Sequence, residues 1–65
     1  MIDLKCNLLE KGQQVIVPDP NSSDTHNHSF IGTVIDILDD RGTAIIEDQC
    51  GEYYEIEGDR LEINE

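Results

Sequence analysis

The chain has 65 residues, of which 15 are acidic and four are lysine or arginine, giving a formal net charge of −11. A chain of this length forms one small domain that buries only about 60% of its unfolded surface, which leaves no room for a large enclosed catalytic cleft. The negative charge argues against direct binding to nucleic-acid phosphates or to anionic lipid.

The N-terminal stretch MIDLKCNLLEKG carries Asp3 near its start and lacks the apolar run of a signal peptide. No stretch of 18 apolar residues offers a membrane span. We therefore expect a soluble, cytoplasmic protein with no membrane partner. In that compartment Cys6 and Cys50 are expected to remain reduced thiols.

The first half of the chain predicts one strand and one long loop. Residues 1–9 have apolar positions that fit a helical turn or an irregular arm equally well, and we expect an N-terminal arm of loop or short strand. In KGQQVIVPDP, Gly12 marks a turn, a β-branched run forms the first strand, and two prolines end it. Residues 18–28 hold no periodic apolar pattern and predict a loop.

The second half predicts four more strands separated by tight turns. SFIGTVIDIL is a long strand in which Gly32 marks a bulge or a close approach of backbone. DDRG turns the chain through Gly42, so TAIIED should return antiparallel to it. QCG turns again, EYYEIE alternates with Tyr54 and Ile56 facing inward, and DRLEIN supplies a short last strand.

Five short antiparallel strands predict an all-β fold, a small barrel over residues 10–65, because closure removes the exposed edges of a flat sheet. The expected core is built from inward-facing residues of every strand, together with Phe30 as the plug at the barrel mouth. Its members are Val15, Val17, Phe30, Val34, Ile46, Tyr54, Ile56 and Leu61.

The succession KGQQVIV, FIGTVIDI, TAIIED and GEYYEIEGDRLEI resembles the small bacterial SH3-like barrels, the group that includes KOW-type and Tudor-like modules. The shared features are a glycine-led first strand, GTV in the second, a hairpin, and an xxL turn before the closing strand. The resemblance implies a five-stranded antiparallel SH3-like barrel that acts as a non-enzymatic adaptor. KOW-type RNA binders need basic faces and a Tudor-like cage needs several clustered aromatics, whereas this chain has only Phe30, Tyr53 and Tyr54.

The stretch SSDTHNHSF places Asp24, His26 and His28 on alternating positions, which in an extended chain point to one side. A divalent ion could bind there if the loop curled to bring these side chains together, with Cys50 or another acid as a fourth ligand. The H-x-H pattern without a cysteine pair is a weak metal signature. A polar loop with two solvated histidines is the simpler interpretation, and we expect no metal and no cofactor.

Catalysis has little support in the sequence. Nothing marks a pair of carboxylates in different environments, as acid–base chemistry requires. The acids around Cys50 in DQCGE disfavour its thiolate, and Ser29 has no GxSxG context. We expect a protein that is not an enzyme.

Two functions remain. Residues 31–65 carry eleven acids and two bases, a net of −9, against −2 for residues 1–30. The first function is an interaction module that binds a protein partner through the long loop and neighbouring side chains. The second is a decoy that presents carboxylates to a basic protein in place of nucleic-acid phosphates. The plain alternative is that acidity only keeps a small monomer soluble. We favour the module, with partner-binding candidates Asp24, His26, His28, Tyr53, Glu47, Glu55 and Glu57.

Overall fold

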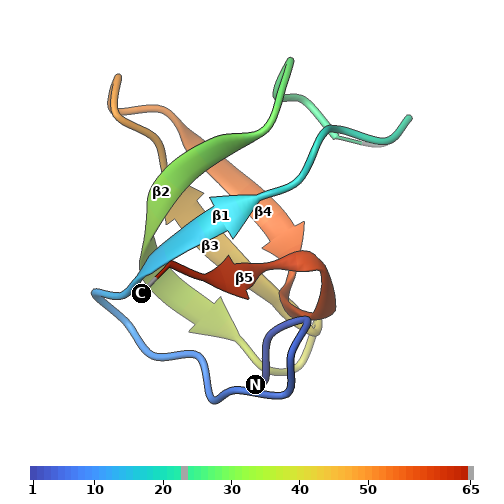
Figure 1. Cartoon of the computed structure of the whole chain (residues 1–65), viewed down its shortest axis with the longest axis vertical. Coiled ribbons are helices and arrows are strands. Elements are labelled where there is room, and N and C mark those ends of the chain that lie inside the picture. The colour runs from blue at the N-terminus through green and yellow to red at the C-terminus, as the bar shows by residue number, and fades with distance from the viewer. Residues whose placement is uncertain (23, 65) are drawn as a thin grey trace.

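Five β-strands form one antiparallel sheet in the order β4-β3-β2-β1-β5 (Figure 1), in a computed structural model that describes residues 1–22 and 24–64. The expected all-β class is confirmed. Ser23 of the expected loop and Glu65 at the end of the expected barrel lie outside the described residues. The elements are β1 (Gln14–Val17), β2 (Phe30–Leu38), β3 (Thr43–Glu47), β4 (Tyr53–Glu57), the 3-10 helix η1 (Gly58–Arg60) and β5 (Glu62–Ile63).

The two hairpin turns of the sheet each contain a glycine with a positive φ. Gly42 has a φ of 68° and connects β2 to β3, so Leu38 pairs with Thr43 as the predicted hairpin requires. The last strand is shorter than predicted, because Asp59 and Arg60 belong to η1 and β5 begins at Glu62. The backbone N–H of Leu61 donates to the Gly58 carbonyl and closes that turn.

Gly32 is a point of close approach between β2 and β3. A Cβ on this residue would lie 2.5 Å from Ile46 Cγ2 and 2.7 Å from the carbonyl oxygen of Glu47, so no larger residue fits without displacing β3. The close-approach alternative is therefore confirmed. The bulge lies elsewhere, between Val34 and Asp36, where the pairing of β2 with β3 shifts by one residue.

The core is one cluster that draws side chains from β1, β2, β3 and β4, so the sheet curls around a shared interior. Six of the eight predicted members are fully buried, and Phe30 and Tyr54 are partly buried and pack against them. Leu9 and Ala44 also belong to the core and were not expected there. Burial of each such Val, Leu or Ile side chain stabilises the folded state by about 1.5–3 kcal/mol relative to leaving it exposed.

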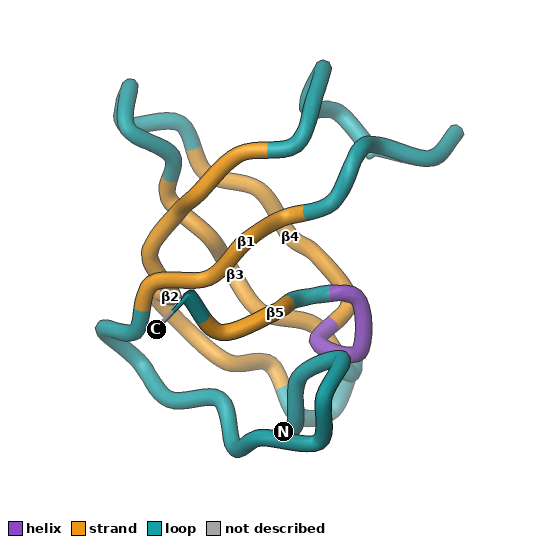
Figure 2. The backbone as a smooth tube through the Cα atoms, viewed as in Figure 1, coloured by secondary structure: helices purple, strands orange, loops and turns teal. Residues whose placement is uncertain are grey.

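The N-terminal segment is tied to β5 and lies beside η1 (Figure 2). The buried carboxylate of Asp3 accepts backbone N–H groups from Lys5 at 2.9 Å, from Asn7 at 2.7 Å and from Ile63 at 3.1 Å. Burial by itself would raise the pKa of Asp3, but these backbone hydrogen bonds outweigh it and the net pKa lies below the ordinary value. Residues 1–9 are thus part of the folded domain, with Asp3 and Leu9 buried in it.

β4 and β5 are the edge strands of the sheet. In the described ranges no ladder pairs these two strands with each other, and η1 connects them. Each edge strand pairs antiparallel with its single neighbour in the sheet. β5 pairs with β1 through Val15 and Ile63, and β4 pairs with β3 along its whole length. On the face of the sheet turned away from the core, Ile31 and Ile35 of β2 and Tyr53 of β4 are exposed.

Candidate functional site

The strand register decides which side chains share the outer face of the sheet. Thr33 on β2 opposes Glu47 on β3, and Glu47 opposes Tyr53 on β4. Residues that face each other across a ladder project from the same side of the sheet, so these three form a row. Tyr53 is 62% exposed at the end of this row. Ile31, two residues before Thr33 on β2, extends the same face and is also exposed.

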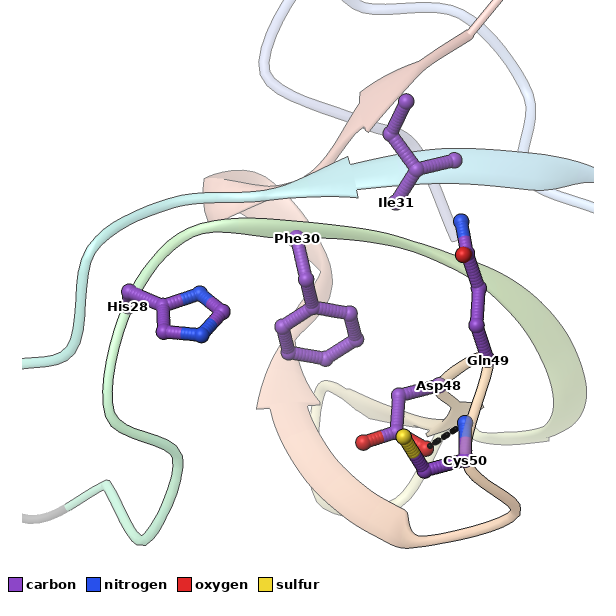
Figure 3. Close-up of a pocket in the computed structure, with 6 residues that line it drawn as sticks. All are labelled: His28, Phe30, Ile31, Asp48, Gln49 and Cys50. Carbon is purple, nitrogen blue, oxygen red and sulfur yellow. Dashed lines mark hydrogen bonds between the residues drawn. The ribbon is translucent and has the colours of Figure 1, made fainter.

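A pocket of about 320 Å³ opens next to this row, between the start of β2 and the β3–β4 turn (Figure 3). Apolar surface comes from the Phe30 ring, the Ile31 side chain and the Cys50 thiol. Polar groups come from His28, Asp48 and Gln49. This volume lies near the lower end of the roughly 300–1,000 Å³ range of ligand pockets, so the occupant must be small. The pocket is lined by His28, Phe30, Ile31, Asp48, Gln49 and Cys50.

The β3–β4 turn holds one carboxylate in place at the pocket. Asp48 Oδ1 accepts the backbone N–H of Cys50 at 2.8 Å and that of Glu52 at 2.9 Å, and Gly51 completes the turn with a φ of 87°. The other carboxylate oxygen, Oδ2, has no hydrogen-bond partner within residues 1–22 and 24–64. A fixed negative group with one free oxygen therefore stands at the pocket wall.

Three rings pack together behind the pocket. His26 lies edge-on to Phe30, with ring centroids 5.5 Å apart, and edge-on to Tyr54 at 5.7 Å. Phe30 and Tyr54 are 5.4 Å apart. Edge-to-face pairs at these distances are favourable beyond their burial of area. The cluster fixes the position of Phe30, which packs against the core and also lines the pocket.

The expectation that both histidines are solvated is wrong for His26, which is only 5% exposed. Its ring covers Phe30 and Tyr54, and its Nε2–H donates to the carbonyl oxygen of Pro18 at 2.8 Å, which satisfies one ring nitrogen without water. The other nitrogen, Nδ1, is buried and has no hydrogen-bond partner among residues 1–22 and 24–64. His28 is exposed, as expected, and its Nδ1 lies 2.8 Å from the Ser29 carbonyl oxygen.

Asp24 is also turned inward, and its carboxylate is 4% exposed and paired with Arg60 at 2.7 Å. Asp24, His26 and His28 therefore do not converge on one point, because the first pairs with Arg60 and the second bonds to Pro18. In the described part of the chain no group of three His, Cys, Asp or Glu side chains is arranged to hold a metal ion. Both cysteines are free and exposed.

The three predicted glutamates have different surroundings. Glu55 accepts a hydrogen bond from Thr43 Oγ1 at 2.7 Å and lies 3.4 Å from Arg41, and Glu57 lies 3.4 Å from Arg60. Glu47, next to Tyr53, has no ion pair among the residues described. Of the three, only Glu47 lacks an ion pair in the described ranges, and Asp48 and Glu52 of the adjoining turn likewise have none there.

The negative field at this end of the sheet affects Tyr54. Burial raises the pKa of its hydroxyl, and the nearby charges of Asp48 and Glu52 raise that pKa further. All four lysine and arginine side chains lie within 4 Å of a carboxylate: Lys5 by Glu62, Lys11 by Asp36, Arg41 by Glu55, and Arg60 by Asp24. The basic side chains thus pair with carboxylates outside the β3–β4 turn, and the net charge of that turn stays negative.

Sequence reasoning missed most of the pocket. The sequence predicts Phe30 as a core residue only and offers Cys50 as a metal ligand or a nucleophile, and no pattern in it marks Ile31, Asp48 or Gln49. The turn sequence DQCG gives the hairpin tip, and Asp at the first position of such a turn favours the side-chain hydrogen bonds seen here. The contact of this tip with the start of β2 depends on the register, which the sequence leaves open.

Among the described residues there is no helix of the length and apolar character needed to cross a membrane. Comparison of the chain with protein-family models, with curated proteins and with solved structures finds no match. The chemistry of the pocket and the outer face is therefore the basis on which a function is proposed.

Proposed function

We propose that this protein is a non-enzymatic, acidic SH3-like interaction module that binds a basic segment of a protein partner. The contact surface is the pocket face, which we define as the six pocket residues together with Thr33, Glu47 and Tyr53. The SH3-like assignment draws support from the antiparallel strands and from the turn at η1 just before Leu61 and the closing strand.

The observation that carries the proposal is the exposed ring of Tyr53 beside a small pocket and three uncompensated carboxylates. Tyrosine is enriched at the centres of protein interfaces, where its ring buries a large area while its hydroxyl keeps a polar partner. Glu47, Asp48 and Glu52 give the same region a negative potential, which attracts a basic segment and suppresses acidic ones. A rigid sheet with a binding loop at its end is a common way to build such a surface.

The test begins with capture of proteins from the source cell, elution by salt, and purification of the protein that elutes. The affinity of that protein is then measured for the parent chain, for Tyr53→Ala and for Leu8→Ala. Leu8 is the matched control because it is an exposed apolar side chain on the N-terminal segment, outside the pocket face. We expect Tyr53→Ala to weaken binding about tenfold or more and Leu8→Ala to leave it unchanged. Equal affinities for all three chains would rule out the pocket face as the contact surface.

A decoy for a basic protein is the second candidate, favoured by the pairing of all four basic side chains with carboxylates. In a decoy, many carboxylates replace phosphates, so double-stranded DNA should displace the captured protein and Tyr53→Ala should have little effect. A module should show the opposite pattern, with a large effect of Tyr53→Ala and no displacement by DNA.

A further inference from the structure

The pocket combines apolar side chains with one carboxylate oxygen, Asp48 Oδ2, that has no hydrogen-bond partner among the described residues. The Phe30 ring projects from β2 toward the β3–β4 turn, which carries Asp48 and Cys50, whereas the Ile31 side chain projects to the other side of the strand (Figure 3). Long basic side chains bury their methylene groups against apolar surface and keep the charged end at a polar group. The pocket offers both kinds of contact within a volume of about 320 Å³.

We infer that this pocket takes a lysine side chain of the partner, with the alkyl stem on the Phe30 ring and the ammonium at Asp48 Oδ2. The inference rests on the proposed function, since the lysine belongs to the basic segment that the pocket face binds. It adds the identity of the side chain at the centre of that surface.

The hydrogen bonds of Asp48 favour lysine over arginine. Arginine pairs best with a carboxylate through two parallel hydrogen bonds, one to each oxygen. Asp48 Oδ1 is already occupied by the backbone N–H groups of Cys50 and Glu52, so only Oδ2 is free for a ligand. An ammonium is a compact charge that needs one oxygen, and this is what the turn presents.

His28 supplies a second acceptor at the pocket. In the neutral ring, Nδ1–H donates to the Ser29 carbonyl oxygen at 2.8 Å, which leaves the lone pair of Nε2 free. Both His28 and Asp48 line the pocket. Glu47 and Glu52 add negative charge next to the pocket without lining it.

The probe for this inference is n-butylammonium chloride, which carries the lysine stem and head without a backbone. Backbone NMR signals of the full chain are followed during titration, with n-butanol and sodium chloride at matched concentrations as controls. We expect saturable shifts at Ile31, Gln49 and Cys50 with n-butylammonium and none that saturate with the controls. n-Butylguanidinium is titrated in parallel and should bind more weakly.

Asp48→Asn tests the role of the carboxylate while keeping the turn, because the asparagine Oδ1 can still accept both backbone N–H groups. We expect this variant to lose about fivefold in affinity for n-butylammonium. Asp59→Asn is the matched control, since Asp59 is an exposed acid on η1, away from the pocket. Equal losses in the two variants, or shifts scattered over the acidic surface, would overturn the inference. Tighter binding of n-butylguanidinium would overturn the choice of lysine.

The two proposals fail in distinguishable ways. If n-butylammonium gives no pocket shifts while Tyr53→Ala still weakens the partner, the lysine pocket is wrong and the interaction module stands. If n-butylammonium fills the pocket in an Asp48-dependent way while Tyr53→Ala leaves partner binding unchanged, the proposed contact surface is wrong and the cation site stands.

Discussion

Arg60 on η1 holds Asp24 of the long loop through two hydrogen bonds, Nη2 to Oδ2 at 2.7 Å and Nη1 to Oδ1 at 3.2 Å. The partners are 36 residues apart in the chain, and both side chains are largely buried. A bidentate pair of this kind combines charge with fixed geometry. The pair connects the loop that carries His26 to η1, the turn before β5. It therefore stabilises the packing of the His26, Phe30 and Tyr54 rings.

This pair predicts a specific loss of stability in acid. Hydrogen bonds from Arg60, and then from the Asn21 backbone, hold the pKa of Asp24 below its ordinary value of 3.8. A carboxyl whose pKa is lower in the folded state stabilises the fold above the unfolded pKa and loses that contribution as pH falls through the folded pKa. Urea unfolding from pH 7 to pH 2.5 should show this decline in the parent.

Asp24→Asn is the variant that checks the acid response. It should be less stable than the parent at pH 7, where it leaves Arg60 with only the longer ion pair to Glu57, and it should decline less below about pH 4. Asp3 retains its own lowered pKa in this variant, so part of the decline persists. Asp59→Asn, an exposed acid on η1, should follow the parent. Parallel acid curves for parent and Asp24→Asn would contradict the role assigned to the pair.

The two histidines should differ in their effect on stability. His26→Ala removes the ring that packs on Phe30 and Tyr54 and the hydrogen bond to Pro18, so we expect a loss of about 2–4 kcal/mol in the free energy of unfolding. His28→Ala changes an exposed side chain and should stay within about 0.5 kcal/mol. Denaturant unfolding measures both. Similar values for the two variants would mean that His26 does not hold the ring cluster together.

Ile56 tests the inward face of β4. It is fully buried in the core, so Ile56→Ala should cost about 2–5 kcal/mol, enough to unfold a marginal domain of this size. Ile35→Ala is the control, because Ile35 is 42% exposed at the bulge of β2. Thermal melts of the two variants should separate widely. A melting temperature of Ile56→Ala within a degree or two of the parent would disprove this placement.

Salt should stabilise the fold. The uncompensated carboxylates repel one another more in the folded state than in the extended chain, and the Debye length falls from about 30 Å at 0.01 M to about 8 Å at 0.15 M ionic strength. The melting temperature should therefore rise over that range. Glu52→Gln should raise it at low salt, because Glu52 has no ion pair in the described ranges.

Glu55→Gln is the matched comparison for Glu52→Gln. This change also removes one negative charge, but it weakens the contacts of Glu55 with Arg41 and Thr43, so its gain at low salt should be smaller. Neutralising Glu47, Glu55 and Glu57 together would remove three negative charges, but the loss of the ion pairs of Glu55 with Arg41 and of Glu57 with Arg60 reduces the gain in stability. A flat response of the parent to salt would exclude self-repulsion as a contribution to its stability.

The sequence by itself was enough to locate the strands. β-Branched runs, glycines that allow a positive φ at Gly42 and Gly51, and the alternation in EYYEIE are local properties, and each led to an element that is present. The inward direction of Tyr54 and Ile56 followed from the two-residue period of a strand alone. The short last strand was placed too early, because the turn at η1 depends on a hydrogen bond between Leu61 and Gly58 that local patterns do not encode.

Only the tertiary structure decided the site. The bulge between Val34 and Asp36 shifts the register by one residue, and that shift places Thr33 opposite Glu47, on the face of Tyr53. A one-residue slip moves every side chain of a strand to the other face, so the sequence could not place the hairpin tip against β2. The sequence likewise predicts Asp24 and His26 as solvated loop residues. Asp24 is buried because it pairs with Arg60, and His26 is buried because it packs on the rings of Phe30 and Tyr54. Arg60 and Tyr54 are distant from the loop in the chain, so the loop sequence does not reveal these contacts.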